Sequence, residues 1–204
     1  MKKPKLRELF EALRSFFSLP YTSSFPRTVS EVPDGFRGRP RFYEEFCVGC
    51  KACVEVCPAK AIDVEDIAFL PGKGIRKLTH HYDVCIFCGQ CEEACITEKG
   101  IMLSKEYDLA SDDRAQMTDV VSKDLLFCEL CGSPVSCVDH IRWIAKKIGL
   151  LAYSNPTLFL TRNKEELKVL AAETKADKRE IVRADQLRVT CPACRRDILF
   201  REQW

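Results

Sequence analysis

The chain has 204 residues, a formal net charge of +2 and 46% hydrophobic residues. This length allows one or two domains, and the apolar content is enough for a folded core. The near-neutral charge argues against a general nucleic-acid binder, which needs a basic surface. No apolar run reaches the roughly 20 residues of a membrane-spanning helix, and no secretory signal is recognisable, so we expect a cytoplasmic protein, soluble or peripheral.

Residues 1–19 are predicted to form an amphipathic helix with one apolar face. The apolar residues of this face follow the i, i+3, i+4, i+7 spacing of a helix; they are Leu6, Leu9, Phe10, Leu13, Phe16 and Phe17. This face either packs on its own domain or docks on a partner protein or the membrane surface. We favour docking, because a core of about 70 residues has little room for six large side chains.

Prolines and glycines recur through residues 20–42 and forbid regular helix there. This composition predicts an extended arm laid over another surface. We therefore treat residues 1–42 as one segment, an amphipathic helix followed by a docking arm.

Cysteine is the outlier of the composition, with 13 residues. An odd count fits poorly with complete disulfide pairing, and no secretory address is present, so metal ligation is the better interpretation. Residues 43–110 contain eight of these cysteines in two similar motifs, which form an internal repeat. The motifs read "CVGCKACVEVCP" from Cys47 and "CIFCGQCEEAC" from Cys85.

Both motifs have the C-x₂-C-x₂-C-x₃-C spacing of two-cluster ferredoxins, in which the fourth cysteine of each motif ligates the other cluster. A tight loop directs three thiolates at one [4Fe–4S] cluster, and the fourth cysteine points away. The expected ligand sets are Cys47, Cys50, Cys53 and Cys95 for one cluster, and Cys85, Cys88, Cys91 and Cys57 for the other.

Four apolar residues are expected to keep water from these clusters: Val48, Ile62, Ile86 and Phe87. Ile96 follows Cys95 where the usual motif has proline, which changes the turn but removes no ligand atom. His80 and His81 precede the second motif. They are either surface residues, the simpler interpretation, or groups near a cluster that couple proton uptake to reduction.

The remaining cysteines lie in residues 120–204. Cys128, Cys131, Cys191 and Cys194 form two C-x₂-C pairs, which together supply the four thiolates of a structural zinc site. A third iron–sulfur cluster or a single iron ion are the alternatives. Cys137 is left over, either as a buried inert residue or as a replacement ligand.

Between the two pairs, residues 139–153 are predicted to form a helix, and a second helix is predicted to begin at Asn163. Residues 186–190 and 197–200 are predicted to be short strands around the last cysteine pair. The fold class is therefore α+β. It combines a bacterial two-cluster ferredoxin-like domain over residues 43–110, the N-terminal helix and arm, and a zinc-ribbon-like domain with a helical insertion over residues 120–204.

Over residues 1–110 the chain resembles the small two-cluster iron–sulfur subunit of complex-I-related enzymes. The resemblance rests on the N-terminal helix, the arm ending "PDGFRGRP", the two motifs and the following "LSKEYDLA". The tail, with "CELCGSP" and "CPACRR", is similar to the version found in formate hydrogenlyase and in related membrane-bound [NiFe] hydrogenases.

This resemblance implies a non-catalytic electron-relay subunit with two [4Fe–4S] clusters and one zinc ion, at the cytoplasmic face of a membrane. Its partners would be the hydrogenase small and large subunits, membrane-arm subunits, and an upstream donor such as formate dehydrogenase, carbon monoxide dehydrogenase or a ferredoxin. The alternatives are a complex I subunit or a free soluble ferredoxin. A zinc-ribbon module for nucleic acid is a third hypothesis, which the charge balance disfavours.

Overall fold

The computed structural model describes residues 5–19, 22, 25–163 and 183–200. The chain divides into two compact units, residues 1–36 and residues 37–204. Among the described residues, no helix combines the length and the apolar character that crossing a membrane requires.

The first unit contains helix α1 (Leu6–Phe17), which confirms the helix predicted near the N-terminus. Lys5 precedes the helix, and its backbone N–H donates to Glu8 Oε2 at 3.0 Å, so the first turn is capped. All six apolar residues of the predicted face are exposed. No residue of α1 is buried, so the apolar face has no cover within the described part of this unit.

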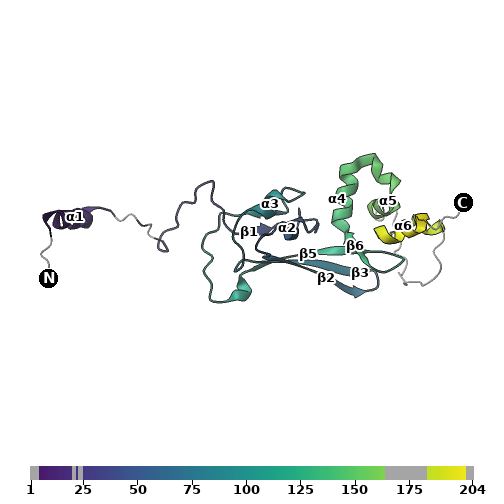
Figure 1. Ribbon diagram of the computed structural model, residues 1–204, viewed down its shortest axis with the longest axis horizontal. Coiled ribbons are helices and arrows are strands. Elements are labelled where there is room, and N and C mark those ends of the chain that lie inside the picture. The colour runs from purple at the N-terminus through teal and green to yellow at the C-terminus, as the bar shows by residue number, and fades with distance from the viewer. Residues whose placement is uncertain (1–4, 20–21, 23–24, 164–182, 201–204) are drawn as a thin grey trace. The chain divides into compact units, whose positions relative to one another are not determined.

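The second unit is built on a four-stranded antiparallel sheet with the order β2-β3-β5-β6 (Figure 1). Its strands are β2 (Ile62–Leu70), β3 (Lys73–His81), β5 (Thr118–Phe127) and β6 (Pro134–Cys137). Along β3 the side chains alternate between buried and half-buried, as expected for a strand covered on one face. Arg76, Leu78 and His80 share the buried face.

The two cysteine motifs lie beside this sheet. Each motif leads into a single helical turn, α2 (Ala52–Glu55) after the first loop and α3 (Gln90–Glu93) after the second. A small two-stranded sheet joins β1 (Pro40–Phe42) to β4 (Ile101–Leu103). The core between the motifs contains Cys53, Ile62, Cys91 and Ile101. The repeated sequence is thus folded as one ferredoxin-like body of helices and strands, as predicted.

The last part of the chain is more helical than predicted. A 3₁₀ turn, η1 (Arg114–Gln116), precedes β5, and β6 is followed by α4 (Val138–Ile148), η2 (Gly149–Ser154) and α5 (Pro156–Asn163). After residues outside the described part come η3 (Arg183–Leu187) and α6 (Pro192–Phe200). The helix predicted over 139–153 is present as α4 and η2.

Two strand predictions in this region are wrong. η3 covers residues 186–187, residues 188–190 are in neither a strand nor a helix, and α6 covers residues 197–200. The helix predicted to begin at Asn163, with Glu166 in its cap, falls on residues outside the described part, and Asn163 itself belongs to α5. Pro192 explains α6, because proline fits the first turn of a helix, where its missing N–H is not needed.

Strand β5 joins the two predicted parts of this unit. Residues 118–124 pair with residues 75–81 of β3, so the sheet of the ferredoxin hairpin continues into the C-terminal region. Leu125 and Leu126 then pair with Cys137 and Ser136 of β6. The division into domains at residues 43–110 and 120–204 stays a prediction, and the observed sheet crosses it.

Candidate metal centres

The first cavity is lined by the sulfur-bearing side chains of four cysteines, three from the first motif and one from the second: Cys47, Cys50, Cys53 and Cys95. The rest of the lining is mainly apolar and includes Phe42, Val48, Leu78, Ile96 and Ile101. The structure therefore brings together the cysteines of the first expected ligand set. It also places Ile96, the residue that replaces proline, on the cavity wall.

The second cavity is lined by the other four: Cys57, Cys85, Cys88 and Cys91. Pro40, Pro58, Ile62 and Ile86 contribute apolar lining, and His80 contributes its ring. Phe87 is not among the lining residues. In each cavity, three cysteines come from one loop and the fourth from the other repeat, which is the exchange that the spacing predicts.

The two loops have the same backbone shape, but their glycines stand at different positions. Gly49 and Lys51 have φ values of 69° in the first loop, whereas Phe87 and Gly89 have φ values of 52° and 81° in the second. Each loop thus has two left-handed residues, two and four positions after its first cysteine. Glycine fills the earlier position in the first loop and the later position in the second.

Burial controls the protonation of the thiols nearest the core. It raises the pKa of Cys53 to about 12 and the pKa of Cys91 to about 11, because a thiolate without a counter-charge is costly in an apolar site. At Cys95 burial acts in the same direction, but hydrogen bonds from Thr97 outweigh it and lower the pKa. Thr97 Oγ1 lies 3.3 Å from Cys95 Sγ. Thr97 is a site residue that the motif did not reveal.

These donor sets fit iron–sulfur clusters. Each cavity offers four cysteine sulfurs and is otherwise lined mainly by apolar side chains; neither lining includes a carboxylate, and His80 is the imidazole that lines the second cavity. Thiolate ligands of this kind select soft metals and iron–sulfur clusters. When bound, each cluster supplies a one-electron redox centre.

The first loop is covered from outside by residues of the sheet. The guanidinium of Arg76 donates to the Gly49 carbonyl at 2.9 Å, and Cys137 Sγ lies 3.5 Å from the same oxygen. Lys123 Nζ donates to the Glu44 carbonyl just before the motif at 2.6 Å. Cys137 is fully buried, and burial raises the pKa of its thiol to about 11. It is therefore held as a neutral thiol against the first loop.

His80, for which the sequence leaves two interpretations open, is buried beside the second cavity. Its side chain is 1% exposed, and Nδ1 has no hydrogen-bond partner within the described chain. The ring contacts Phe42 and Tyr82 at centroid distances of 6.2 and 4.9 Å. Burial lowers the pKa of His80 to about 4, so the imidazole is neutral. His81, by contrast, is partly exposed and pairs with Asp63 at 3.1 Å.

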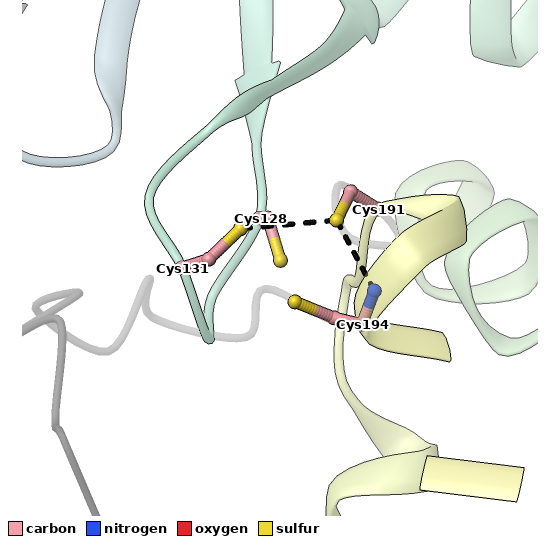
Figure 2. A group of neighbouring side chains, drawn as sticks. All are labelled: Cys128, Cys131, Cys191 and Cys194. Atoms are coloured by element: carbon pink, nitrogen blue, oxygen red, sulfur yellow. Dashed lines mark hydrogen bonds between the residues drawn. The ribbon is translucent and has the colours of Figure 1, made fainter. Parts of the chain in front are cut away.

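The four tail cysteines converge on one point, as Figure 2 shows. Cys128 and Cys131 lie in the turn between β5 and β6, and Cys191 and Cys194 lie at the start of α6. Their four sulfur atoms all lie within 4.8 Å of one another, and Cys131 Sγ is 3.7 Å from Cys191 Sγ. A tetrahedral site with Zn–S bonds of about 2.3 Å requires sulfur separations of about 3.8 Å. The cage therefore has the dimensions of a four-thiolate metal site.

The tail thiols differ in their affinity for protons. Burial raises the pKa of Cys128, and burial together with hydrogen bonding to its neighbours raises that of Cys194. At Cys131 burial also acts to raise the pKa, but hydrogen bonds from Ser133 and the adjacent cysteines lower it to about 6. The Cys131 thiolate is thus available at neutral pH to begin metal binding, whereas Cys128 and Cys194 must release protons.

Comparison with known proteins agrees with the iron–sulfur interpretation. Residues 46–99 match the family of 4Fe-4S dicluster domains. The chain is 33% identical over 100 residues to NAD(P)H-quinone oxidoreductase subunit I of Gloeobacter violaceus, covering 48% of this chain and 47% of that protein. It is 31% identical over 122 residues to NADH-quinone oxidoreductase subunit I 2 of Geobacter metallireducens, covering 56% of this chain and 90% of that protein.

A further relative is formate hydrogenlyase subunit 6 of Escherichia coli, which is 33% identical over 121 residues, 59% of this chain and 64% of that protein. The chain thus spans about half the length of the Gloeobacter protein and nearly two thirds of the Escherichia coli one. Among solved structures, a chain of the membrane-bound sulfane sulfur reductase, an archaeal respiratory membrane complex, aligns with a TM-score of 0.40 at 26% identity. That alignment covers 57% of this chain and 61% of the other.

Proposed function

Because the chain belongs to the family of NADH-quinone oxidoreductase subunit I proteins, the iron–sulfur subunits of complex-I-related enzymes, we propose that it relays electrons through two [4Fe–4S] clusters inside a larger complex. The observation that carries this proposal is the pair of cavities, each with four cysteine side chains drawn from both repeats.

We assign Cys47, Cys50, Cys53 and Cys95 to one cluster and Cys57, Cys85, Cys88 and Cys91 to the other. Mainly apolar side chains line both sites, and the shared core holds the two sites together. Exchange of the fourth cysteine links the loops, so neither site can be completed without the other motif.

The assignment is tested by iron content in paired variants, which needs no spectroscopic separation of the clusters. Anaerobically purified wild-type protein should hold about eight irons and one zinc per chain. Cys57→Ala with Cys88→Ala removes two ligands of one proposed set, so about four irons should remain. Cys57→Ala with Cys50→Ala removes one ligand from each set, so both clusters should be lost. The opposite ranking of these two variants would show that the sets are not exchanged between motifs, and Cys137→Ala serves as the matched control that keeps all ligands.

We propose that Cys128, Cys131, Cys191 and Cys194 bind a structural zinc ion. The support is the convergence of four sulfurs within 4.8 Å of one another, because four thiolates are the closed ligand set of structural zinc. In this role the metal ties α6 to the β5–β6 turn and organises the zinc-ribbon-like region proposed for residues 120–204. About twelve irons and no zinc in the purified protein would assign this cage to a third cluster instead.

The proposed partners are the other subunits of a membrane-associated complex of the [NiFe] hydrogenase or formate hydrogenlyase type, together with an upstream electron donor. Sequence similarity to formate hydrogenlyase subunit 6 and the four-cysteine tail support this branch. Similarity to the quinone oxidoreductase subunits supports complex I as the second candidate. In either case the chain would lie at the cytoplasmic face as a peripheral subunit.

The exposed apolar face of α1 supports a fixed position in a complex rather than a free carrier, because six large apolar side chains without cover favour association. Removing residues 1–36 tests this. The shortened chain should keep its full iron content, since residues 37–204 form a compact unit of their own, but it should no longer copurify with its complex. A shortened chain that still assembles would favour the soluble carrier.

A further inference from the structure

The carbonyl group of Gly49, inside the first cysteine loop, is held by two side chains from outside the loop. Arg76 on β3 donates to it through Nη1 at 2.9 Å, and Cys137 at the end of β6 lies 3.5 Å from it through Sγ. A Cβ atom on Gly49 would lie 2.5 Å from Cys137 Sγ. The close approach of Cys137 explains why glycine, and no larger residue, stands at this position.

The guanidinium that makes this contact is itself fixed. Arg76 is 6% exposed, and its Nε and Nη2 atoms donate to the two carboxylate oxygens of Asp66 at 2.7 and 2.8 Å. Lys51, within the first loop, lies 3.6 Å from the same carboxylate. Together Arg76, Asp66 and Lys51 carry a net charge of +1. The bidentate Arg76–Asp66 contact fixes the orientation of the guanidinium.

This contact also orients the next peptide N–H. A trans peptide is planar, so its C=O and N–H groups point in opposite directions. The Gly49 carbonyl points outward to Arg76, and the N–H of Cys50 therefore points to the inner side of the loop, where Cys50 lines the first cavity. Hydrogen bonds to cluster sulfur are one of the factors that set the reduction potential of iron–sulfur clusters.

The second loop has no such support. Its residue equivalent to Gly49 is Phe87, whose carbonyl accepts no hydrogen bond within the described part of the chain. The nearby Cys88 carbonyl accepts only a longer contact, 3.3 Å, from the exposed Arg37. Both loops have left-handed residues at the same two positions, but among the described residues a buried cation contacts the backbone of the first loop only.

We propose that Arg76 is a positioning residue that raises the reduction potential of the first cluster above that of the second, by fixing the Gly49–Cys50 peptide and by placing a buried positive charge outside the loop. This inference rests on the proposed function, since it requires both clusters. A reduced cluster carries one more negative charge, so a fixed N–H dipole and a nearby cation both favour reduction. The relay is then asymmetric, and an electron shared between the clusters resides mainly on the first.

The test is a redox titration of the full chain, followed by electron paramagnetic resonance under anaerobic conditions. The signal of the first cluster is identified in the Cys57→Ala, Cys88→Ala variant, which lacks the second proposed set. In Arg76→Met we expect the equilibrium constant for reduction of the first cluster to fall at least tenfold, about 59 mV for one electron. The second cluster should change less than threefold. An unchanged first cluster, or equal changes in both, would overturn the proposal.

Two further variants separate the positioning role from charge and from folding. In Arg76→Met with Asp66→Asn, both charges of the pair are removed and the Gly49 carbonyl still lacks its guanidinium donor, so the first cluster should stay at least threefold harder to reduce than in wild type. Full recovery in this variant would overturn the positioning role. Arg76→Lys keeps the charge and the fold without the bidentate contact. It should lower the equilibrium constant for reduction of the first cluster less than Arg76→Met does, and an unchanged constant would contradict the role of the guanidinium.

Lys77→Met on the same strand is the matched control, because neighbouring residues on a strand face opposite sides and Lys77 is half-buried whereas Arg76 is buried. Its first cluster should titrate as in wild type. Failure of the proposed function gives a different result, since wild-type protein would then lack the two cluster signals altogether.

Discussion

From the contact between Gly49 and Cys137 we predict that substitutions at these two residues have non-additive effects on stability. In Gly49→Ala the new methyl group lies 2.5 Å from Cys137 Sγ, on a backbone with a φ of 69°. A left-handed conformation costs a non-glycine residue about 1–2 kcal/mol, and overpacking a close-packed site costs about 1–3 kcal/mol. The substitution should therefore cost about 2–5 kcal/mol of stability.

The second substitution, Cys137→Ala, removes the sulfur that causes the clash. Alone it should cost about 1 kcal/mol, the loss of one buried heavy atom and its hydrogen bond. When it is combined with Gly49→Ala, the stability lost through overpacking should be regained. The double variant should therefore be more stable than the sum of the two single effects predicts, by about 1–3 kcal/mol. The backbone term at Gly49 then remains, together with the milder contacts of the new methyl group with the Cβ atoms of residue 137 and Lys123, each at 3.3 Å.

The assay is the urea concentration at which cluster absorbance is half lost after a fixed anaerobic incubation, measured for wild type and the three variants. With a slope of about 1–3 kcal/mol per molar urea, the coupling corresponds to a shift of about 1 M. Gly132→Ala is the control for the backbone term, because Gly132 has a φ of 71° but no atom within 4 Å of an added Cβ. If Gly49→Ala costs the same in the presence and absence of Cys137, the packing argument is refuted.

Three other outcomes follow from the structure. Zinc binding to the metal-free chain at pH 7 should release at least two protons, because the pKa values of Cys128 and Cys194 are raised. Calorimetry in buffers of different ionisation enthalpy measures this number, and a binding enthalpy that does not depend on the buffer would contradict it. Leu78→Ala should cost about 2–5 kcal/mol and speed the loss of the first cluster more than the second, seen by anaerobic absorbance decay, because Leu78 is 1% exposed and lines the first cavity only. Tyr82→Phe should lower the free energy of unfolding by about 1–3 kcal/mol, since the buried Tyr82 hydroxyl donates to the Pro40 carbonyl at 2.7 Å; an unchanged urea midpoint would show that this carbonyl finds another partner.

Which cysteine side chains lie together can be predicted from the sequence, because short motifs encode their own local geometry. The spacing from Cys47 and from Cys85 determines which side chains one loop can direct inward, and two adjacent repeats can then exchange their fourth residues. The approach of Cys131 to Cys191, 60 residues apart, can also be predicted, because four thiols in two close pairs have few other uses. These inferences depend on residue type and spacing and need no knowledge of the tertiary packing.

The surroundings of the sites could not be predicted in the same way. Arg76 looks like an ordinary basic residue of a strand, and only the alternation of Arg76, Leu78 and His80 hints that the three share one buried face. Cys137 was interpreted as a buried inert residue or a replacement ligand, because nothing in the sequence shows that β6 approaches Gly49. Such contacts join segments 27 and 88 residues apart, so they are determined by the fold as a whole.

The strand predictions near the last cysteine pair failed for a related reason. A run of four residues such as 197–200 fits a strand and a helix equally well, and its neighbours decide between them. Here Pro192 begins α6, and Ile198 is buried on that helix. The short apolar run is therefore one side of a helix.

Strand β5 has a consequence for the chain while it is being made. Residues 118–124 cover the edge of β3, and both iron–sulfur motifs are synthesised before this strand emerges. Until then, backbone groups of residues 75–81 are open on one side, and such an edge readily pairs with other chains. The growing first half is thus the aggregation-sensitive form of this protein, and a fragment ending before residue 118 should need a fused solubility partner that the full chain does not.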